Sequence, residues 1–405
     1  MPASGDDATA GMPDARRAWW AAVLMLGAVV VTPVLVGVLS LQIQDDLAMD
    51  NSQLGLCVTV FWLCTAVAAA LGGRHADRLG WRRAAVIGCG LCLVGQLGIA
   101  ASRSMATLFA CLAVGGVAYG IVAPTSNLAV VREIPLRLRG TALGAKQSAA
   151  PVAGLVAGLA VPAVALTIGW RWAFVIIAVV AVLAAAASWP SGIQLTPTSP
   201  GATTVSARGR TTQSPAKPLS LPRVAVSAGL GTLSIGVLTT FSAQTLTRAG
   251  MSISAAGVVI AGCSVAALVV RLVAGWLTDR RSSDGLLPAA VMIAVGAVGM
   301  LMMATGGIAL TVLGAVLAFC GGWGWPALLL LGVLTYHPAR PAAASGRFQL
   351  GTALGAAVGP LVFAAVGEAA GFLTAWVVVA ACTAASALLI ALDAWGRRPG
   401  HAPAV

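Results

Sequence analysis

Two basic side chains, Lys146 and Arg271, lie well inside long apolar stretches of the sequence. The acidic residues nearest to a stretch interior, Glu368 and Asp393, fall at the ends of theirs. An ionised group inside a bilayer is unfavourable unless it is paired or hydrated, so such residues are functional candidates. A guanidinium binds a carboxylate through two parallel hydrogen bonds, and an ammonium adds a point charge. The two cations therefore predict a site for an anion, with the alternative that both extend to the aqueous boundary and only support the structure.

Further side chains are candidates for the walls of such a site. Trp323 and Trp325 stand in the middle of an apolar stretch, whereas membrane tryptophans favour the interface. Residues two positions apart on a helix point about 200° apart, so we expect at most one of the two to face a solute. Trp325 is favoured because Tyr119 is its counterpart in the internal repeat of the chain. Gln147 and Asn127 offer hydrogen-bonding groups, although bonding between helices is an equal alternative for each.

The composition excludes several classes of protein. Hydrophobic residues make up 59% of the 405 residues and charged residues only 9%. Soluble domains carry about 25% charged residues, so the chain is predicted to be a membrane protein. The eight cysteines all fall in apolar stretches, and the sequence has neither a metal-ligand cluster nor the glycine-rich loop of nucleotide-driven pumps. We therefore expect no enzymatic activity, no cofactor and no metal.

Twelve apolar stretches follow one another, each long enough for a bilayer-spanning helix of about 20 residues. They cover approximately 20–43, 53–73, 84–101, 105–131, 140–167, 171–189, 224–247, 253–277, 286–305, 307–336, 348–367 and 371–392. The expected fold is an all-α membrane protein with two six-helix halves. The predicted domains are a tail (1–18), a first half (19–189), a linker rich in Pro, Ser and Thr (190–223), a second half (224–394) and a tail (395–405).

Positive charges are distributed unevenly over the loops between these stretches. Nineteen Lys and Arg residues fall on the side of the N-terminus, whereas Arg103, Arg171 and Arg248 alone fall on the other. Cytoplasmic loops carry the excess of positive charge, so both termini and the linker are predicted to be cytoplasmic in a bacterial inner membrane. This topology accounts for most of the net charge of +12 without a nucleic-acid partner.

The two halves repeat each other in sequence. The segment Gly73–Arg78 and the segment Gly275–Arg280 both read GxxxDR, at an offset of 202 residues. The segment Gly115–Tyr119 matches Gly321–Trp325 at an offset of 206 residues, with paired glycines followed by an aromatic residue. Matches at nearly one offset indicate a duplicated six-helix unit, and parallel repeats of this kind build one group of secondary transporters.

The two buried cations do not follow this repeat. Thr352 stands at the position that corresponds to Lys146, and Ala69 stands where Arg271 would map. A charge that supports the scaffold should recur in both copies, whereas a charge that binds a solute need not. The absence of counterparts therefore favours a solute-binding role.

The sequence resembles the major facilitator superfamily over essentially its whole length. The most specific match is the loop Gly73–Arg83, which is similar to the signature G-x-x-x-D-R-x-G-R-R/K of that family and departs from it at Arg74, His75 and Trp81. The resemblance implies that the Asp caps and pairs across the cytoplasmic helix ends of the two halves and holds that side shut. The implied latch residues are Gly73, Asp77, Arg78, Arg82, Gly275, Asp279 and Arg280. The neighbouring arginines are expected to make charge-assisted bonds with the carboxylate. The alternative for the arginines is that they serve topology alone.

Three segments resemble bacterial cyanate- or nitrate-type anion transporter branches of this family: Arg139–Gln147, Gly169–Trp172 and Gly322–Pro326. Arg271, four residues before Gly275, also resembles the substrate-binding arginine of the monocarboxylate-transporter branch. We expect a monomeric transporter that moves a small anionic solute across the lipid bilayer by rocking of its two halves. Coupling to a proton is left open. The alternative is an exporter of neutral or cationic hydrophobic compounds.

Overall fold

The computed structural model describes residues 12–49, 51–160, 164–165, 167–189 and 219–397. These residues form helices and their connections, without any strand. A helix satisfies every backbone polar group within its own segment, which is why apolar stretches of this length form helices in a bilayer. The prediction of an all-helical membrane protein is confirmed. Most of the predicted linker and parts of both predicted tails lie outside the described residues.

The first half of the chain forms eight α-helices and one 3₁₀ turn among the described residues. They are α2 (Met12–Val38), α3 (Ser40–Leu47), α4 (Asn51–Leu79), α5 (Trp81–Ala101), α6 (Met105–Glu133), η1 (Leu136–Leu138), α7 (Arg139–Gln147), α8 (Ala149–Ala160) and α9 (Trp170–Ser188).

The second half of the chain forms seven α-helices among the described residues. They are α10 (Leu221–Arg248), α11 (Ile253–Arg280), α12 (Leu286–Met303), α13 (Ile308–Gly324), α14 (Pro326–Tyr336), α15 (Pro341–Ala370) and α16 (Phe372–Trp395).

Two of the predicted spans are broken in their middle. Eleven spans of the described chain are long and apolar enough to cross a bilayer, and one of them combines α13 and α14, which meet at Trp325. The fifth predicted span is divided at Ser148 into α7 and α8, each too short to cross alone. Taken together, α7 and α8 supply the twelfth span, in agreement with the prediction. A proline follows each break, Pro151 in α8 and Pro326 at the start of α14.

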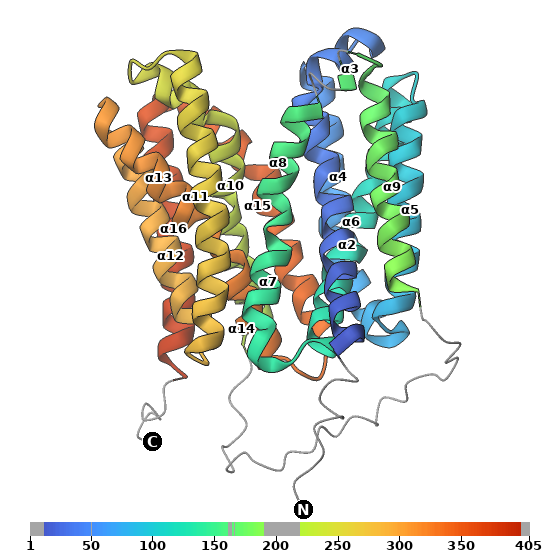
Figure 1. The fold of residues 1–405 in the computed structure, drawn as a ribbon. Helices are drawn as coiled ribbons and strands as arrows, with labels where there is room; N and C mark the ends of the chain where they lie inside the picture. Colours follow the sequence, from blue (N-terminus) through green and yellow to red (C-terminus); the bar gives the residue numbers. More distant parts are fainter. Residues whose placement is uncertain (1–11, 50, 161–163, 166, 190–218, 398–405) are drawn as a thin grey trace, which may run out of the picture.

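The two halves form two bundles side by side (Figure 1), which meet mainly where α4 packs on α15 and α7 packs on α11. We call the lower end in Figure 1, at which α4 and α11 finish, the latch end. Glycines allow close contact between backbones there. A Cβ at Gly140 of α7 would lie 2.7 Å from the carbonyl oxygen of Gly275 in α11. A Cβ at Gly73 of α4 would overlap the carbonyl of Ala342 in α15.

The turn between α4 and α5 consists of one residue, Gly80. Its φ of 82° lies in the left-handed region, which residues with a Cβ rarely adopt. This turn fixes the signature loop at the latch end, with Asp77 in the last turn of α4 and the basic residues of the loop close to it.

Candidate functional site

Asp77 and Asp279 each connect the two halves at the latch end. Asp77 of α4 accepts hydrogen bonds from the backbone N–H groups of Ala342 (3.1 Å) and Ala343 (2.8 Å), in the first turn of α15. The first N–H groups of a helix have no partner within the helix and carry partial positive charge. The carboxylate of one half therefore caps a helix of the other half.

The repeat reproduces this arrangement with the halves exchanged. Asp279 of α11 accepts from the N–H groups of Gly140 (2.7 Å) and Thr141 (2.6 Å), in the first turn of α7. The Thr141 hydroxyl donates a third hydrogen bond to the same carboxylate, at 2.6 Å. The glycine of each motif, Gly73 or Gly275, lets the two helices approach so closely that the carboxylate reaches the opposite helix.

The arginines of the two motifs do not bind these carboxylates, contrary to the expectation that they form charge-assisted bonds. Arg78 is exposed and forms no hydrogen bond or ion pair within the described part of the chain. Arg82 lies over the ring of Trp81, with its Cζ 5.2 Å from the ring centroid. Arg280 lies over Trp276 at 4.4 Å. In this conformation backbone N–H groups satisfy the carboxylates, and the arginines lie at the surface.

Arg271 connects the two halves a few turns deeper than the latch. Its side chain is 4% exposed. Nε donates to the carbonyl oxygen of Trp323 in α13 at 2.8 Å, and Nη2 donates to the same oxygen. Nη1 donates to the carbonyl oxygen of Gln147, the last residue of α7 in the other half, at 2.5 Å. The guanidinium thus binds carbonyls near the C-terminal ends of two helices, where the backbone carries partial negative charge.

Pro151 explains why the Gln147 carbonyl accepts this hydrogen bond. In an uninterrupted helix, this carbonyl would accept from the N–H group of residue 151, but proline has none. The break between α7 and α8 at Ser148 therefore presents a backbone acceptor to the other half.

Lys146 is buried in the last turn of α7, directly before Gln147, with 1% of its surface exposed. Its Nζ donates to the Ser126 hydroxyl of α6 at 2.9 Å and to the side-chain oxygen of Asn127. Gly144 in the same helix packs against the Arg271 carbonyl, so the two cation-bearing helices are in direct contact. Asn127, predicted as a wall of the solute site, is a partner of Lys146 in this conformation.

No carboxylate neutralises these two cations among the residues that the structure describes. The ion pairs of the described chain join Arg171 to Asp46, and Arg223 and Arg397 to Asp393. Lys146 and Arg271 have neutral acceptors only. An ammonium and a guanidinium together carry eight donor N–H groups. Lys146 and Arg271 therefore still offer N–H donors and two positive charges to a further ligand.

The aromatic candidates take different positions from those expected. Trp325 is fully buried, with its ring against Gly231 and 6.2 Å from Phe348, so in this conformation it packs between helices, and its contact with a solute stays a prediction. Trp323 is the tryptophan beside Arg271, whose Cζ lies 5.9 Å from its ring. The indole N–H of Trp323 is buried and has no hydrogen-bond partner among the described residues, which adds another donor near Arg271.

Tyr119 is buried in α6 and stacks on Phe61, with the ring centroids 6.1 Å apart. Its hydroxyl is directed to the side chain of Gln349 in α15, so it belongs to the contact between the halves. Gln349, Ser126 and Pro151 were not among the site residues predicted from the sequence. For Pro151 a signal was present, because it stands four residues after Gln147 in a predicted span.

Comparison with known proteins identifies the family. The family model described as Major Facilitator Superfamily matches residues 19–308. The chain belongs to this superfamily. Its members are membrane transport proteins, and the described part of this chain has the spans of a multi-pass membrane protein. The cyanate/nitrate branch suggested by the sequence stays a prediction.

Curated relatives match part of the superfamily fold. The puromycin resistance protein pur8 of Streptomyces alboniger is 33% identical over 178 residues, which are 42% of this chain and 35% of that protein. The hexuronate transporter of Bacillus subtilis is 26% identical over 141 residues, 35% of this chain and 33% of that protein. The chain spans between 26% and 35% of the length of the curated relatives that it matches.

A solved structure of the superfamily has the same fold. The crystal structure of the human organic anion transporter MFSD10 superposes with a TM-score of 0.71 at 19% identity, covering 94% of this chain and 99% of that chain. At this identity the likeness establishes the fold.

Proposed function

We propose that this superfamily member carries a small anionic solute, and that Arg271 and Lys146 bind it. The supporting observation is that both cations are buried beside the contact between the halves with neutral acceptors only. A charged acceptor binds a guanidinium more strongly than a neutral carbonyl does. An anion that reaches Arg271 therefore has an energetic advantage over the Gln147 carbonyl.

Such an exchange would couple binding to movement. In the described conformation the Arg271–Gln147 hydrogen bond holds the halves together above the two capping aspartates. An anion that takes over Arg271 removes one bond between the halves and lowers the free energy required to open the latch end. Rocking of the halves would then expose the solute on the other side, as in transporters built from two parallel repeats.

The relatives support two solute classes. The hexuronate transporter of Bacillus subtilis is named for a carboxylate, which suits a guanidinium. The second candidate, export of neutral or cationic hydrophobic compounds, is favoured by the likeness to the puromycin resistance protein. Under that alternative, Arg271 and Lys146 would join helices and would repel a cationic solute.

We further propose that the protein works as a monomer in the bacterial inner membrane. The unequal distribution of Lys and Arg supports a cytoplasmic location for both termini, the latch end and the linker 190–223. A coupling proton, if one is used, would be carried by Lys146 or travel with the solute, since no carboxylate lies in a span interior of the described chain.

Transport by proteoliposomes tests the proposal. We expect uptake of a labelled carboxylate from a panel that includes a hexuronate, with uptake lowered at least about tenfold by Arg271→Gln, the loss expected from one charge-assisted bond. Arg248→Gln, which removes a cation at the opposite end, is the matched control and should retain uptake. Carboxylate uptake that is unchanged in Arg271→Gln, or transport of puromycin alone, would favour the exporter instead.

A further inference from the structure

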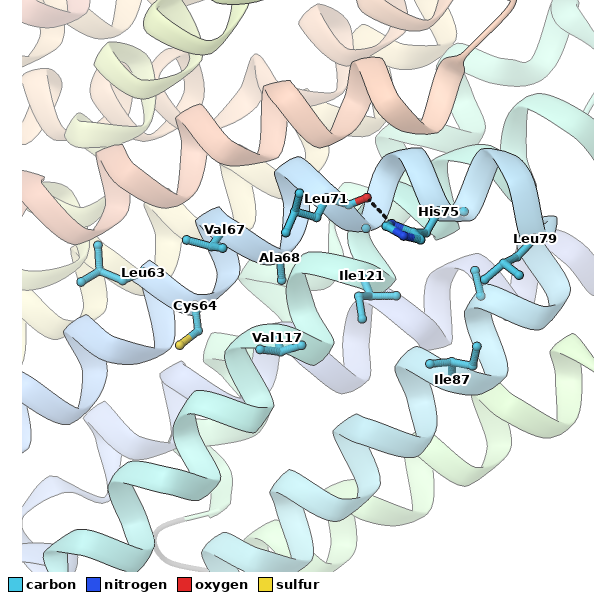
Figure 2. A pocket seen from close by; sticks show the side chains of 13 residues that line it. Leu63, Cys64, Val67, Ala68, Leu71, His75, Leu79, Ile87, Val117 and Ile121 are labelled. Atoms are coloured by element: carbon cyan, nitrogen blue, oxygen red, sulfur yellow. Dashed lines mark hydrogen bonds between the residues drawn. The ribbon is translucent and has the colours of Figure 1, made fainter.

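An apolar groove of about 630 Å³ lies between α4, α5 and α6 on the outside of the first bundle (Figure 2). Its walls are the side chains of Leu63, Val67, Leu71, Ile87, Val117 and Ile121. The α4 residues at the floor of the groove are small and buried: Ala68, Gly72 and Ala76 recur every four residues along one side of the helix. Such a volume is in the range that holds a drug-sized ligand.

The groove opens to the surrounding bilayer. The outer walls are exposed, at 63% for Val67, 54% for Leu71 and 50% for Ile87, and they belong to spans that cross the membrane. From Leu63 to Leu79 the helix rises about 24 Å, whereas one leaflet of the hydrocarbon core is about 15 Å thick. The groove therefore covers the depth of the leaflet at the latch end and reaches its headgroup region. A lipid acyl chain has the shape and the chemistry to fill it.

Basic groups gather where the groove reaches the headgroup region. His75, the polar side chain of the lining, binds the Leu71 carbonyl through Nδ1 at 2.9 Å (Figure 2), which leaves its Nε2 edge available. Arg78 follows His75 by three residues, on the same side of α4. Arg83 precedes Ile87 by one turn on α5. Both arginines are exposed and form no ion pair within the described chain.

We propose that this groove binds one anionic phospholipid, with an acyl chain along α4 and the phosphate headgroup between Arg78, Arg83 and His75. The uncompensated positive charge at one end distinguishes this groove from an ordinary lipid-facing surface and selects an anionic headgroup over a zwitterionic one. This role also gives a use to the signature-loop arginines that do not bind Asp77. The occupant would hold the end of α4 against α5, next to the capping carboxylate.

Photo-crosslinking tests this site. The protein is reconstituted in phosphatidylcholine nanodiscs with a small fraction of phosphatidylglycerol that carries a diazirine on its acyl chain, and the adducts are mapped by mass spectrometry. We expect labels concentrated on peptides 63–87 and 117–121. Diazirine-labelled phosphatidylcholine at the same fraction should label them about tenfold less, since two cations near a membrane surface favour an anionic lipid by at least that factor.

Two pairs of variants separate the acyl and headgroup contacts. Leu71→Trp fills the groove from an exposed position and should abolish the concentrated labelling, while Val94→Trp, equally exposed on α5 outside the groove, should not. Arg78→Gln combined with Arg83→Gln should remove the preference for phosphatidylglycerol, while Arg281→Gln at the latch end of the other half should retain it. Equal labelling by the two lipids in the native protein, or adducts spread evenly over all lipid-facing helices, would overturn the proposal.

Discussion

Replacing Pro151 by alanine tests the role of the bond between Arg271 and Gln147. The substitution restores the backbone N–H that an uninterrupted helix would offer to the Gln147 carbonyl, so Arg271 gains a competitor for its acceptor in the other half. A hydrogen bond to a charged group contributes about 1.5–3 kcal/mol. If the new N–H takes the carbonyl, the population closed at the latch end should fall roughly tenfold to hundredfold relative to open states.

Spin-label distances across the latch end measure this shift. Labels at Leu136 and Arg281, both exposed and in opposite halves, report whether that end is closed. The comparison is made in the native background and with Asp279→Asn, which weakens the latch and makes both populations measurable. Pro360→Ala is the matched control, because it also restores an N–H inside a helix but in α15, where the freed carbonyl at Ala356 lies close to α10 of the same half.

Two results would refute the reasoning. Distances that are identical in Pro151→Ala and the native protein, in both backgrounds, would show that the carbonyl is not shared. Equal shifts in Pro151→Ala and Pro360→Ala would assign the effect to general helix stiffening. A double variant with Arg271→Gln supplies a further check, since two changes that remove the same bond should not add.

Two further predictions concern the latch residues, and a third concerns His337, which directly follows α14. Asp279→Asn places an amide N–H₂ where the structure has a carboxylate that accepts from three donors, so the variant should lose at least one charge-assisted hydrogen bond. The population closed at the latch end should fall about tenfold or more, as measured by the same spin-label distances. Gly275→Ala should prevent tight closure, because its Cβ would lie 2.6 Å from the Gly140 carbonyl oxygen, and accessibility of a cysteine at position 141 to a thiol reagent from the latch end should rise. Burial lowers the pKa of His337, whose Nε2 lies 3.0 Å from the Leu219 carbonyl oxygen, so the folded state favours the neutral ring. The stability that the neutral ring contributes is therefore present above about pH 6.5, the ordinary pKa of the ring, and is lost as the pH falls below that value. The thermal unfolding temperature should therefore drop less between about pH 8 and pH 5.5 in His337→Asn than in the native protein, and an equal drop would contradict this assignment.

Much of the architecture follows from the sequence. Twelve apolar stretches of spanning length can form only helices in a bilayer, and the matched GxxxDR motifs identify two related halves. The resemblance of these motifs to the superfamily signature implied that Asp77 and Asp279 join the halves, and their hydrogen bonds do connect them. The position of Lys146 and Arg271 within apolar stretches left open whether the side chains reach the aqueous boundary, and the structure buries both.

The partners of these groups could not be predicted in the same way. Arg78 was expected to bind the latch carboxylate, but the close approach of α4 and α15 brings backbone N–H groups to Asp77 first. Trp325 was favoured over Trp323, but the ring that adjoins Arg271 depends on the rotation of α13 at the break before Pro326. Helix rotation of this kind is set by packing against neighbours, and apolar residues surround most positions of these spans, so hydropathy gives little signal of it.

The number of spans, their pairing into two halves and the residues that carry charge into the membrane can be predicted from the sequence, because they depend on composition and on spacing along one helix. The contacts of those charges depend on how the helices pack. The carbonyl of Gln147 is an acceptor for Arg271 only because Pro151 leaves it unpaired and because Gly144 lets α7 approach α11 closely. Contacts of this type depend on the distance between helices that are more than a hundred residues apart in sequence, and that distance is fixed by the packing of the two halves together.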